Sequence, residues 1–336
     1  MSVGLDIGSK SIKVVELVED GNNFSLKSAG AIGYSGAEID KFQEDKEYAK
    51  LATTIKKLFH DAKIASRDVF MSLPETTVFT RIMKFPLLND QEIASAVKWE
   101  AEEYIPIPIN EAIIEHQILE RREIGNPPQV LVLLIAVGRS LIEKYVKLAQ
   151  MSGLSLIGVE TELLSLVRIL APVDKTSLVI DFGAKSTDIA IAKDGQLYFS
   201  RSVPTAGEAL TRSVAQALGV SITQADEYKR TYGLAQEQLE GKVGTAIGPI
   251  FKVIADEIKK AIHYYKLDIK GDPPSSIILS GGTSGLPGAV STLTRELGTE
   301  VVIGNPFARV KLDPESSKSL ANFTPLYSVS VGLAMR

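Results

Sequence analysis

The sequence contains no cysteine among its 336 residues, and it has only three histidines. Without cysteine the chain can form no disulfide, no thiolate metal site and no cysteine nucleophile, which is typical of the reducing cytoplasm. His60, His116 and His263 lie far apart and share no metal-ligand spacing. The sequence therefore argues against a disulfide scaffold and against a histidine zinc site.

Long hydrophobic runs and a basic excess are also missing. The longest apolar run, Val130–Val137, is far shorter than the about 20 residues that cross a bilayer. Residues 1–17 lack the apolar core of a secretory signal. With 37 Lys and Arg against 41 Asp and Glu, the net charge of -4 does not suit a polyphosphate surface. We expect a cytoplasmic protein that binds no nucleic acid, and any membrane role must come through a partner.

What the sequence does contain is an internal repeat. Val3–Leu17 (VGLDIGSKSIKVVEL) and Leu178–Ala192 (LVIDFGAKSTDIAIA) match without gaps at an Asp, a Gly, a Lys and a Ser. In both copies aliphatic residues run into the Asp and resume after the Ser, which predicts a strand, a tight turn and a second strand. Because the copies begin the two halves of the chain, the repeat predicts two related domains.

Hydrophobic periodicity predicts the elements between and after these hairpins. Helices are expected at 46–65, 90–104, 140–151, 206–218, 221–231, 248–267 and 289–297, and strands at 69–73, 81–85, 129–137 and 276–280. The elements between the two hairpins describe a compact α+β insertion, and those after the second hairpin include a helical subdomain. The last strand ends in Gly281–Gly285 (GGTSG), and ligands of open α/β sheets bind at such carboxyl ends.

Each hairpin turn has the composition of a phosphate-binding loop. Gly8–Ser11 (GSKS) and Gly183–Thr187 (GAKST) combine exposed backbone N–H groups with hydroxyl and ammonium donors. Asp6 and Asp181 precede the turns and are suited to holding Mg²⁺ through its water shell. Two such hairpins facing each other would clamp a polyphosphate. A Walker A loop, a GxGxxG fingerprint and a GxSxG elbow are all missing, which argues against P-loop, Rossmann and serine hydrolase sites.

The two Asp-x-Gly hairpins and the later Gly-Gly-Thr-x-Gly loop resemble the actin-like ATPase superfamily. Within it, Leu88–Pro108 (LNDQEIASAVKWEAEEYIPIP) is similar to the insertion of the PilM family of type IV pilus assembly proteins. Further similar segments are 159–170, 198–211 and the closing SVSVGLAMR. The related FtsA family continues into an amphipathic membrane-targeting helix, so the stop at Arg336 favours the PilM family.

The resemblance implies an α/β fold of the actin-like (ribonuclease H-like) type, with two duplicated halves and inserted subdomains. The first half would be residues 1–165, with core 1–78, part of the connecting segment, and an SHS2-type α+β subdomain at about 79–155. The second half would be residues 166–336, with core 173–203 and 275–336 and a helical subdomain at about 204–274.

The same resemblance implies ATP or ADP with Mg²⁺ between the halves. Asp6 and Asp181 would organise the metal, Asp226 would hydrogen-bond the ribose, and the stem of Lys229 would pack on adenine. Asp226 stands where the superfamily has Glu. Glu160 would orient the attacking water, with Glu162 as the alternative. The remaining nucleotide contacts would come from Gly8, Ser9, Lys10, Ser11, Lys13, Gly183, Ala184, Lys185, Ser186, Thr187, Gly207, Gly281, Gly282 and Thr283.

The resemblance thus implies an ATP-binding component of the pilus assembly platform with at most slow ATPase activity. In this family a groove between the first domain and its insertion receives the N-terminal cytoplasmic peptide of the membrane protein PilN, and other platform proteins are further partners. Two alternatives stay open. One is a filament-forming protein like FtsA, and the other is an actin-fold small-molecule kinase, for which the sequence shows no acceptor-site motif.

Overall fold

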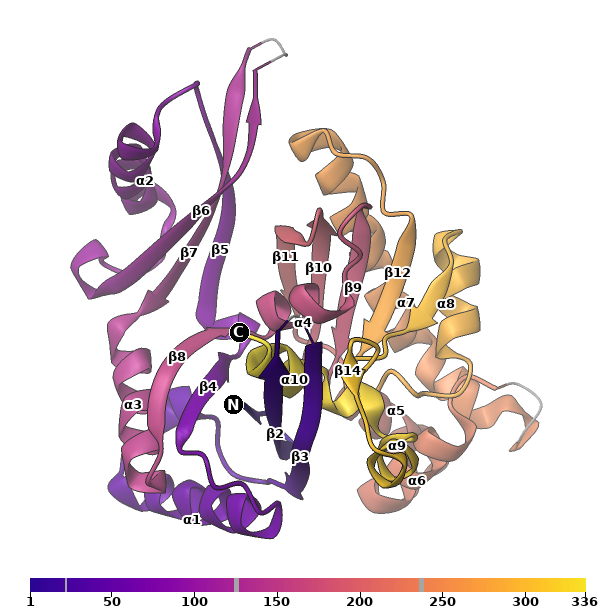
Figure 1. Ribbon diagram of the computed structural model, residues 1–336. Helices are drawn as coiled ribbons and strands as arrows, with labels where there is room; N and C mark the ends of the chain where they lie inside the picture. Colours follow the sequence, from indigo (N-terminus) through magenta and orange to yellow (C-terminus); the bar gives the residue numbers. More distant parts are fainter. Residues whose placement is uncertain (22, 124–126, 236–238) are drawn as a thin grey trace.

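A computed structural model describes residues 1–21, 23–123, 127–235 and 239–336. These residues form three β-sheets (Figure 1). The first sheet has the order β14-β3-β2-β1-β4-β8, the second β11-β10-β9-β12-β13, and the third β5-β7-β6.

The strands of the first sheet are β1 (Ser2–Ile7), β2 (Ser11–Asp20), β3 (Asn23–Gly33), β4 (Asp68–Leu73), β8 (Ser155–Thr161) and β14 (Val310–Lys311). Those of the second are β9 (Ser177–Phe182), β10 (Thr187–Lys193), β11 (Gln196–Val203), β12 (Ser276–Ser280) and β13 (Val301–Ile303). The third consists of β5 (Val78–Phe85), β6 (Ala112–Arg122) and β7 (Gln129–Gly138).

The two large sheets repeat one topology. In each, three antiparallel strands (β3-β2-β1 and β11-β10-β9) are followed by two parallel ones (β4-β8 and β12-β13). The two repeated sequence segments form the central hairpins β1-β2 and β9-β10. The sequence repeat is therefore a repeat of structure, as predicted.

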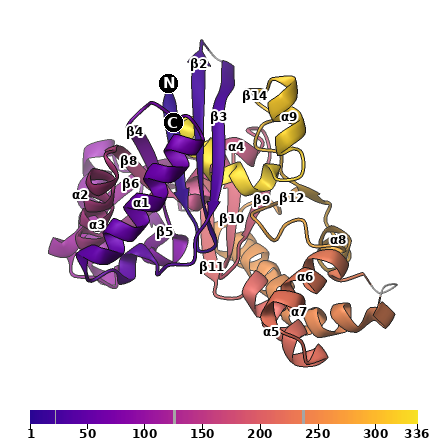
Figure 2. The same cartoon turned by 90° about the horizontal axis from the view of Figure 1, so that it is seen from below.

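Helices cover the outer faces of both large sheets. Against the first lie α1 (Asp45–Asp61) and α3 (Arg139–Ser152), which share a core with β1, β2 and β4. Against the second lie α5 (Gly207–Leu218), α7 (Lys242–Tyr264) and α8 (Ala289–Leu297), and α6 (Ile222–Tyr232) packs on α5 and α7. Figure 2 shows α5, α6 and α7 together on the side of the second sheet away from α1.

Two short helices lie between the large sheets (Figure 1). Helix α4 (Glu162–Leu170) packs on the second sheet, and α10 (Ser328–Ala334) packs on β1, β2 and β4 of the first. They also pack on each other at very close range: a Cβ added at Gly332 would lie 2.3 Å from the Ser165 carbonyl oxygen. A Cβ at Gly4 of β1 would lie 2.0 Å from the Ser330 carbonyl oxygen. Small residues therefore set the spacing of the two halves.

The third sheet and α2 (Asp90–Tyr104) form the inserted subdomain. Asn89 caps α2, and the helix buries Ile93, Val97 and Ala101 against one face of the sheet. The other face of the sheet contributes Leu131 and Leu133 to the cores around the second sheet. Because β7 is buried on both faces, it reads as a continuous apolar run.

Polar contacts reinforce this attachment. The Arg122 guanidinium donates to the Ile269 carbonyl oxygen at 2.9 Å, and Lys84 donates to the Asp268 carbonyl oxygen. Both acceptors lie in the π-helical turn Tyr265–Ile269 that continues α7. The insertion, which branches from the first half, is thereby held against the second half as well.

Helix α7 differs from the sequence prediction at its amino-terminal end. The hydrophobic stripe of Phe251, Ile254 and Ile258 predicts a helix that starts at residue 248. The helix instead begins at Lys242 and carries Pro249 in its interior. Val243 and Ile247 are fully buried, so burial of this extra turn offsets the backbone hydrogen bond that proline cannot make.

Within the described residues, no helix is both long and apolar enough to span a membrane.

The contact between β1 and α10 yields a stability prediction. Gly4→Ala forces a methyl group onto the Ser330 carbonyl, so we expect the free energy of unfolding to fall by about 2–3 kcal/mol. Gly33→Ala is the matched control, because a Cβ there meets nothing within 4 Å. Urea unfolding of both variants checks this, and equal midpoints for the two would contradict the close packing.

Candidate functional site

The two hairpin turns have the same backbone geometry. The Gly8 N–H donates to the Ser11 carbonyl oxygen at 3.1 Å, and the Gly183 N–H donates to the Ser186 carbonyl oxygen at 3.1 Å. Both turns line one cavity between the halves, which we call the cleft cavity. The duplication thus places two equivalent loops on opposite walls of a single site.

Glycine is needed where the walls approach each other. Gly281 has φ +86°, and a Cβ there would lie 2.1 Å from Asp181 Oδ1. A Cβ at Gly8 would lie 2.9 Å from Lys13 Nζ. A larger residue at either position would fill the space beside these charged groups.

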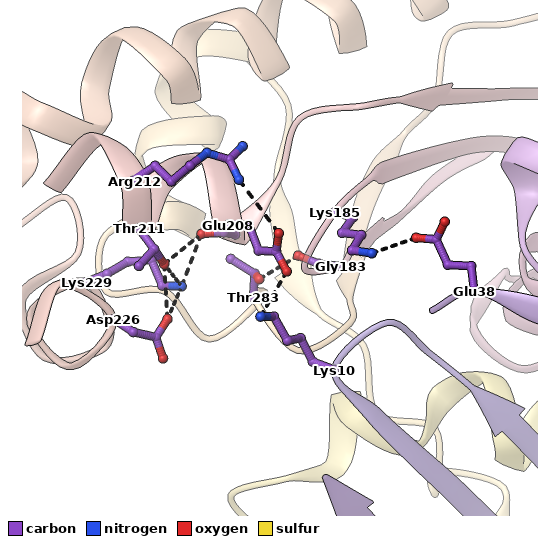
Figure 3. Close-up of polar contacts among 11 residues, drawn as sticks. Lys10, Glu38, Gly183, Lys185, Glu208, Thr211, Arg212, Asp226, Lys229 and Thr283 are labelled. Carbon is purple, nitrogen blue, oxygen red and sulfur yellow. Dashed lines mark hydrogen bonds and ion pairs between the residues drawn. The ribbon is translucent and has the colours of Figure 1, made fainter. Parts of the chain in front are cut away.

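Hydrogen bonds from the GGTSG loop and from the start of α5 support the second loop. The Thr283 hydroxyl donates to the Gly183 carbonyl oxygen at 2.7 Å (Figure 3). The Gly207 N–H reaches the same oxygen at 3.3 Å. The Glu208 N–H donates to the Ala184 carbonyl oxygen at 2.8 Å. The GGTSG loop and the start of α5 therefore fix the conformation of the second loop, which is a candidate phosphate-binding loop.

Acidic side chains gather on one side of the cleft cavity. Glu162, Asp181 and Asp188 each offer a carboxylate oxygen, and these oxygens all lie within 4.8 Å of one another. Asp188 is only 3% exposed, and its Oδ1 has no hydrogen-bond partner in the described structure. Such an arrangement of half-buried and buried carboxylates favours a bound cation.

Asp6 lies in a different environment. Its Oδ2 accepts from Lys13 Nζ at 2.9 Å, and its Oδ1 accepts from the Ser72 hydroxyl at 3.0 Å. Burial acts to lower the pKa of Lys13, but Asp6, Asp181 and Glu162 raise it on balance, so the ammonium stays charged. Lys13 is therefore a fixed positive charge in the wall of the cavity.

Mutual repulsion and burial raise the pKa values of the acid cluster, which disfavours the charged forms of its carboxylates. Burial, followed by the charges of Asp188 and Asp6, raises the pKa of Asp181 to about 7. Burial, followed by the charges of Asp6, Asp181 and Asp188, raises the pKa of Glu162 well above its ordinary value. Without a cation the cluster holds protons near neutral pH.

Two ion pairs cross the cleft (Figure 3). Lys10 of the first loop pairs with Glu208 of α5 at 2.9 Å, and Lys185 of the second loop pairs with Glu38 of the first half at 2.8 Å. Each is partly exposed and contributes about 0.5 kcal/mol. The cavity that they border measures ≈ 120 Å³, less than the about 300 Å³ of small ligand sites.

Most of the predicted phosphate contacts do line this cavity. They are Asp6, Gly8, Ser9, Lys10, Ser11, Lys13, Asp181, Gly183, Ala184, Lys185, Ser186, Gly281 and Gly282. Thr187 is fully buried, and its hydroxyl donates to the Thr205 carbonyl oxygen at 2.7 Å. Thr187, Gly207 and Thr283 thus support the second loop rather than line the cavity.

Asp226 and Lys229 form a network beside the cavity. Lys229 Nζ, buried at 7% exposure, donates to Asp226 Oδ1 at 2.6 Å, to the Thr211 hydroxyl at 2.8 Å and to the Gly207 carbonyl oxygen at 3.2 Å (Figure 3). Burial acts to raise the pKa of Asp226, but Lys229 and Arg230 lower it on balance. The pair ties α6 to the start of α5.

Glu160 is not among the residues that line the cavity. Its carboxylate accepts from Ser165 at 2.6 Å, from Arg168 at 2.7 Å and from Arg336 at 2.6 Å. Burial acts to raise its pKa, but Arg168 lowers it on balance. Since Arg168 also donates to the Gly332 carbonyl oxygen, Glu160 joins β8, α4 and α10, whereas the alternative Glu162 lines the cavity.

Sequence reasoning missed Asp188 and Ser280, which both line the cavity. Asp188 could have been found from the repeat, because the gapless alignment sets it opposite Lys13. An acid and a base at equivalent positions of two duplicated hairpins are a sign of specialised roles. Ser280 ends the strand before Gly281 and carries no comparable signal.

Comparison with known proteins fits this geometry. A family profile with the description "Type IV pilus assembly protein PilM" matches residues 4–336. The chain belongs to this family. A solved structure described as a PilM-PilN type IV pilus biogenesis complex superposes with a TM-score of 0.84 at 28% identity, covering 100% of this chain and 98% of that one.

More distant proteins share the fold. EutJ from Carboxydothermus hydrogenoformans has a TM-score of 0.61 at 17% identity, covering 99% of this chain and 89% of EutJ. MreB5 of Spiroplasma citri bound to ADP has a TM-score of 0.55 at 13% identity, covering 98% and 94%. These similarities confirm the predicted duplicated actin-like fold.

Among curated sequences, FtsA of Staphylococcus epidermidis is 26% identical over 256 residues, 69% of this chain and 55% of FtsA. The match thus spans about half the length of that relative. FtsA of Bacillus subtilis is 21% identical over 345 residues, covering 90% of this chain and 78% of FtsA.

The acid cluster generates a pH prediction for the protein without metal. The folded pKa of Asp181, about 7, lies above the unfolded value near 4, so its contribution to stability is present in acid and is lost as the pH rises toward and through 7. Asp181→Asn removes this loss. In EDTA we expect the gain of the variant over the native protein to be about 2–3 kcal/mol larger at pH 8 than at pH 5, because most of the interval between the two pKa values lies above pH 5.

Thermal unfolding at the two pH values measures this difference. Asp174→Asn, at an exposed position, is the charge-matched control. A gain for Asp181→Asn that is the same at both pH values would contradict the raised pKa.

Proposed function

We propose that this chain is an ATP- or ADP-binding component of the type IV pilus assembly platform, located at the inner face of the cytoplasmic membrane. The nucleotide and Mg²⁺ would bridge the halves, and a PilN-like membrane protein would dock its N-terminal segment on the first half and the insertion. The observation that carries the proposal is the pair of equivalent loops facing one cavity together with the acid cluster.

The residues present suit the phosphates of a nucleotide. Each loop turns its backbone around a glycine, and Lys10, Lys13 and Lys185 supply positive charge on both walls. Tight glycine turns with adjacent ammonium groups bind polyphosphates, since N–H groups can approach the anion without a side chain in between. The nucleoside would lie toward the network of Gly207, Asp226 and Lys229, with Gly282 and Thr283 on its other side.

The acid cluster suits Mg²⁺. A small hard cation takes carboxylate and water oxygens, and the orphaned Asp188 Oδ1 is an acceptor without a donor. Glu162, Asp181 and Asp188 would hold the ion, directly or through its water shell. Asp6, whose oxygens are already used by Lys13 and Ser72, would orient Lys13 and water. When bound, the ion would neutralise phosphate charge.

The cross-cleft ion pairs offer a physical route from nucleotide to partner. A phosphate chain between the two loops would compete with Glu208 and Glu38 for Lys10 and Lys185, and this exchange would remove the ion pairs that join the walls. The insertion branches from the first half and contacts the second half through Leu131 and Arg122. A change in the angle between the halves would therefore alter the groove beside the insertion.

The partner proposal rests on the similar PilM-PilN complex. The first test is calorimetric titration of the full chain with a synthetic N-terminal peptide of the PilN-like protein encoded beside it. We expect binding, with an affinity that Mg-ATP changes by about tenfold or more, which corresponds to about 1.4 kcal/mol of coupling. In Lys10→Ala/Lys185→Ala the peptide should still bind and the effect of Mg-ATP should disappear.

A scrambled peptide is the control for this titration. The absence of peptide binding with and without Mg-ATP would refute the partner proposal. Peptide binding with no detectable affinity for ATP or ADP would refute the nucleotide proposal alone.

The positions of Glu160 and Glu162 lead to a second test. We propose Glu162 as the residue that orients water at the terminal phosphate, because it lines the cavity. Glu162→Gln should lower phosphate release by about 100-fold without lowering the melting temperature. Glu160→Gln should lower the free energy of unfolding by about 2 kcal/mol, because it weakens a buried ion-pair network.

Phosphate release and thermal unfolding of the two variants check this assignment. Loss of turnover in Glu160→Gln at an unchanged melting temperature would reverse it. Release that rises when a sugar or acetate is added would instead favour the small-molecule kinase.

A further inference from the structure

An unusual surface lies far from the cleft cavity, on the outward face of α2. The only tryptophan of the chain, Trp99, is 80% exposed there. The helix buries its opposite stripe, Ile93, Val97 and Ala101, in the core of the insertion. Trp99 therefore contributes nothing to that core, and a largely exposed indole is a common anchor in an interface.

The neighbours of Trp99 on the helix surface are small on one side and acidic on the other. Residues three and four positions away share a helix face, which here gives Ser95 and Ala96 before the indole and Glu102 and Glu103 after it. We call these five residues the Trp99 face. Helical side chains lean toward the amino terminus, so the two carboxylates lean toward the indole.

The charge of this helix is strongly one-sided. It contains one basic residue, Lys98, and five acidic residues: Asp90, Glu92, Glu100, Glu102 and Glu103. Asp90 pairs with Arg121, and Glu92 caps its own helix. For Glu100, Glu102 and Glu103, no ion pair occurs within the described part of the chain. The Trp99 face thus presents uncompensated negative charge beside an aromatic plane.

The same helix shows what complements such a surface. Its other aromatic residue, Tyr104, is half-buried against the core of the insertion and has the Arg81 guanidinium stacked 3.8 Å from its ring centroid. Among the described residues no cation stacks on Trp99 in this way. Tryptophan is the strongest aromatic partner for a guanidinium, and a carboxylate next to it can accept the guanidinium N–H groups.

We propose that the Trp99 face is a docking surface for a positively charged, arginine-containing segment of a partner protein. An arginine of the partner would stack on the indole while its N–H groups donate to Glu102 and Glu103, and Ser95 and Ala96 leave room for the approaching chain. The negative charge disfavours an anionic lipid surface as the occupant. Trp99 is not among the residues that line the cleft cavity, and the proposal does not depend on nucleotide binding.

The single tryptophan makes the face directly observable, because selective indole emission reports on this position alone. The probe is a short synthetic peptide of alternating arginine and glycine, titrated into the full chain. We expect the emission of Trp99 to move to shorter wavelength and its quenching by acrylamide to fall. The lysine-glycine counterpart should bind about fivefold more weakly, because ammonium lacks the planar fork.

Variants are compared by the anisotropy of a dye-labelled probe peptide. Trp99→Ala should weaken binding about tenfold, with Trp99→Tyr in between. Glu102→Gln/Glu103→Gln should weaken it to a similar degree. Glu19→Gln/Asp20→Asn removes the same charge from exposed positions of β2 and should change binding less than about twofold. Circular dichroism melts of all variants should match the native protein, since none of these side chains is buried.

Several results would overturn the proposal. Equal weakening by the two acidic double variants, or equal affinity for the lysine peptide, would mean general electrostatic attraction. A shift in emission with protein concentration alone would identify a second copy of the chain as the occupant. A shift on vesicles of phosphatidylglycerol would identify a membrane, and displacement of the probe by the PilN-like peptide would merge the face with that groove.

Discussion

The close packing of α4 and α10 between the two large sheets is the constraint on which the rest of the structure depends. The backbones of the two helices touch at Gly332 and Ser165. The missing side chain at Gly4 lets α10 pack directly on β1. Glu160 then binds Arg168 and Arg336 across this contact. The distance between the two hairpin turns follows from this packing. Because interiors are close-packed, a change in that distance requires the two sheets to move as bodies.

The electrostatics of the cleft make such a movement responsive to a ligand. Burial and repulsion raise the pKa values of Glu162 and Asp181, while Lys10 and Lys185 reach across the cleft to carboxylates of the opposite half. A divalent cation would reduce the repulsion between the carboxylates, and an anion bound to it would offer the two lysines another partner. The two walls of the cleft are therefore joined by weak, exchangeable contacts, whereas the core packing is rigid. A ligand that replaces those contacts needs to change only a few kcal/mol to shift the balance.

Sequence alone predicted the parts of the fold that repeat or show a clear period. The two hairpins, α2, α8 and β12 lie where the pattern placed them, since buried stripes and glycine turns are local signals. Strands β3, β6 and β8 were missed, because their exposed or half-buried faces mix polar and small residues and they gain stability from neighbours distant in sequence. The site shows the same limit. Glu160 and Glu162 are two residues apart, but the strand ends between them at Thr161, so one joins a structural ion-pair network and the other lines the cavity. No pattern of residue types distinguishes the two.

The duplication also explains why the site is polarised. Equivalent backbones give both halves the same glycine turn, yet the position that carries Lys13 in the first hairpin carries Asp188 in the second. Lys13 neutralises Asp6, so the first wall presents donors, whereas Asp181 and Asp188 leave the second wall with net negative charge beside its own loop donors. A ligand with phosphates alone would satisfy the first wall and be repelled by the second. Only a phosphate chain that carries a cation matches both walls, so on the proposed function the metal would lie toward β9 and β10. Two identical halves would have lacked this polarity, and divergence at one pair of positions is sufficient to give the two walls of the cavity different charge.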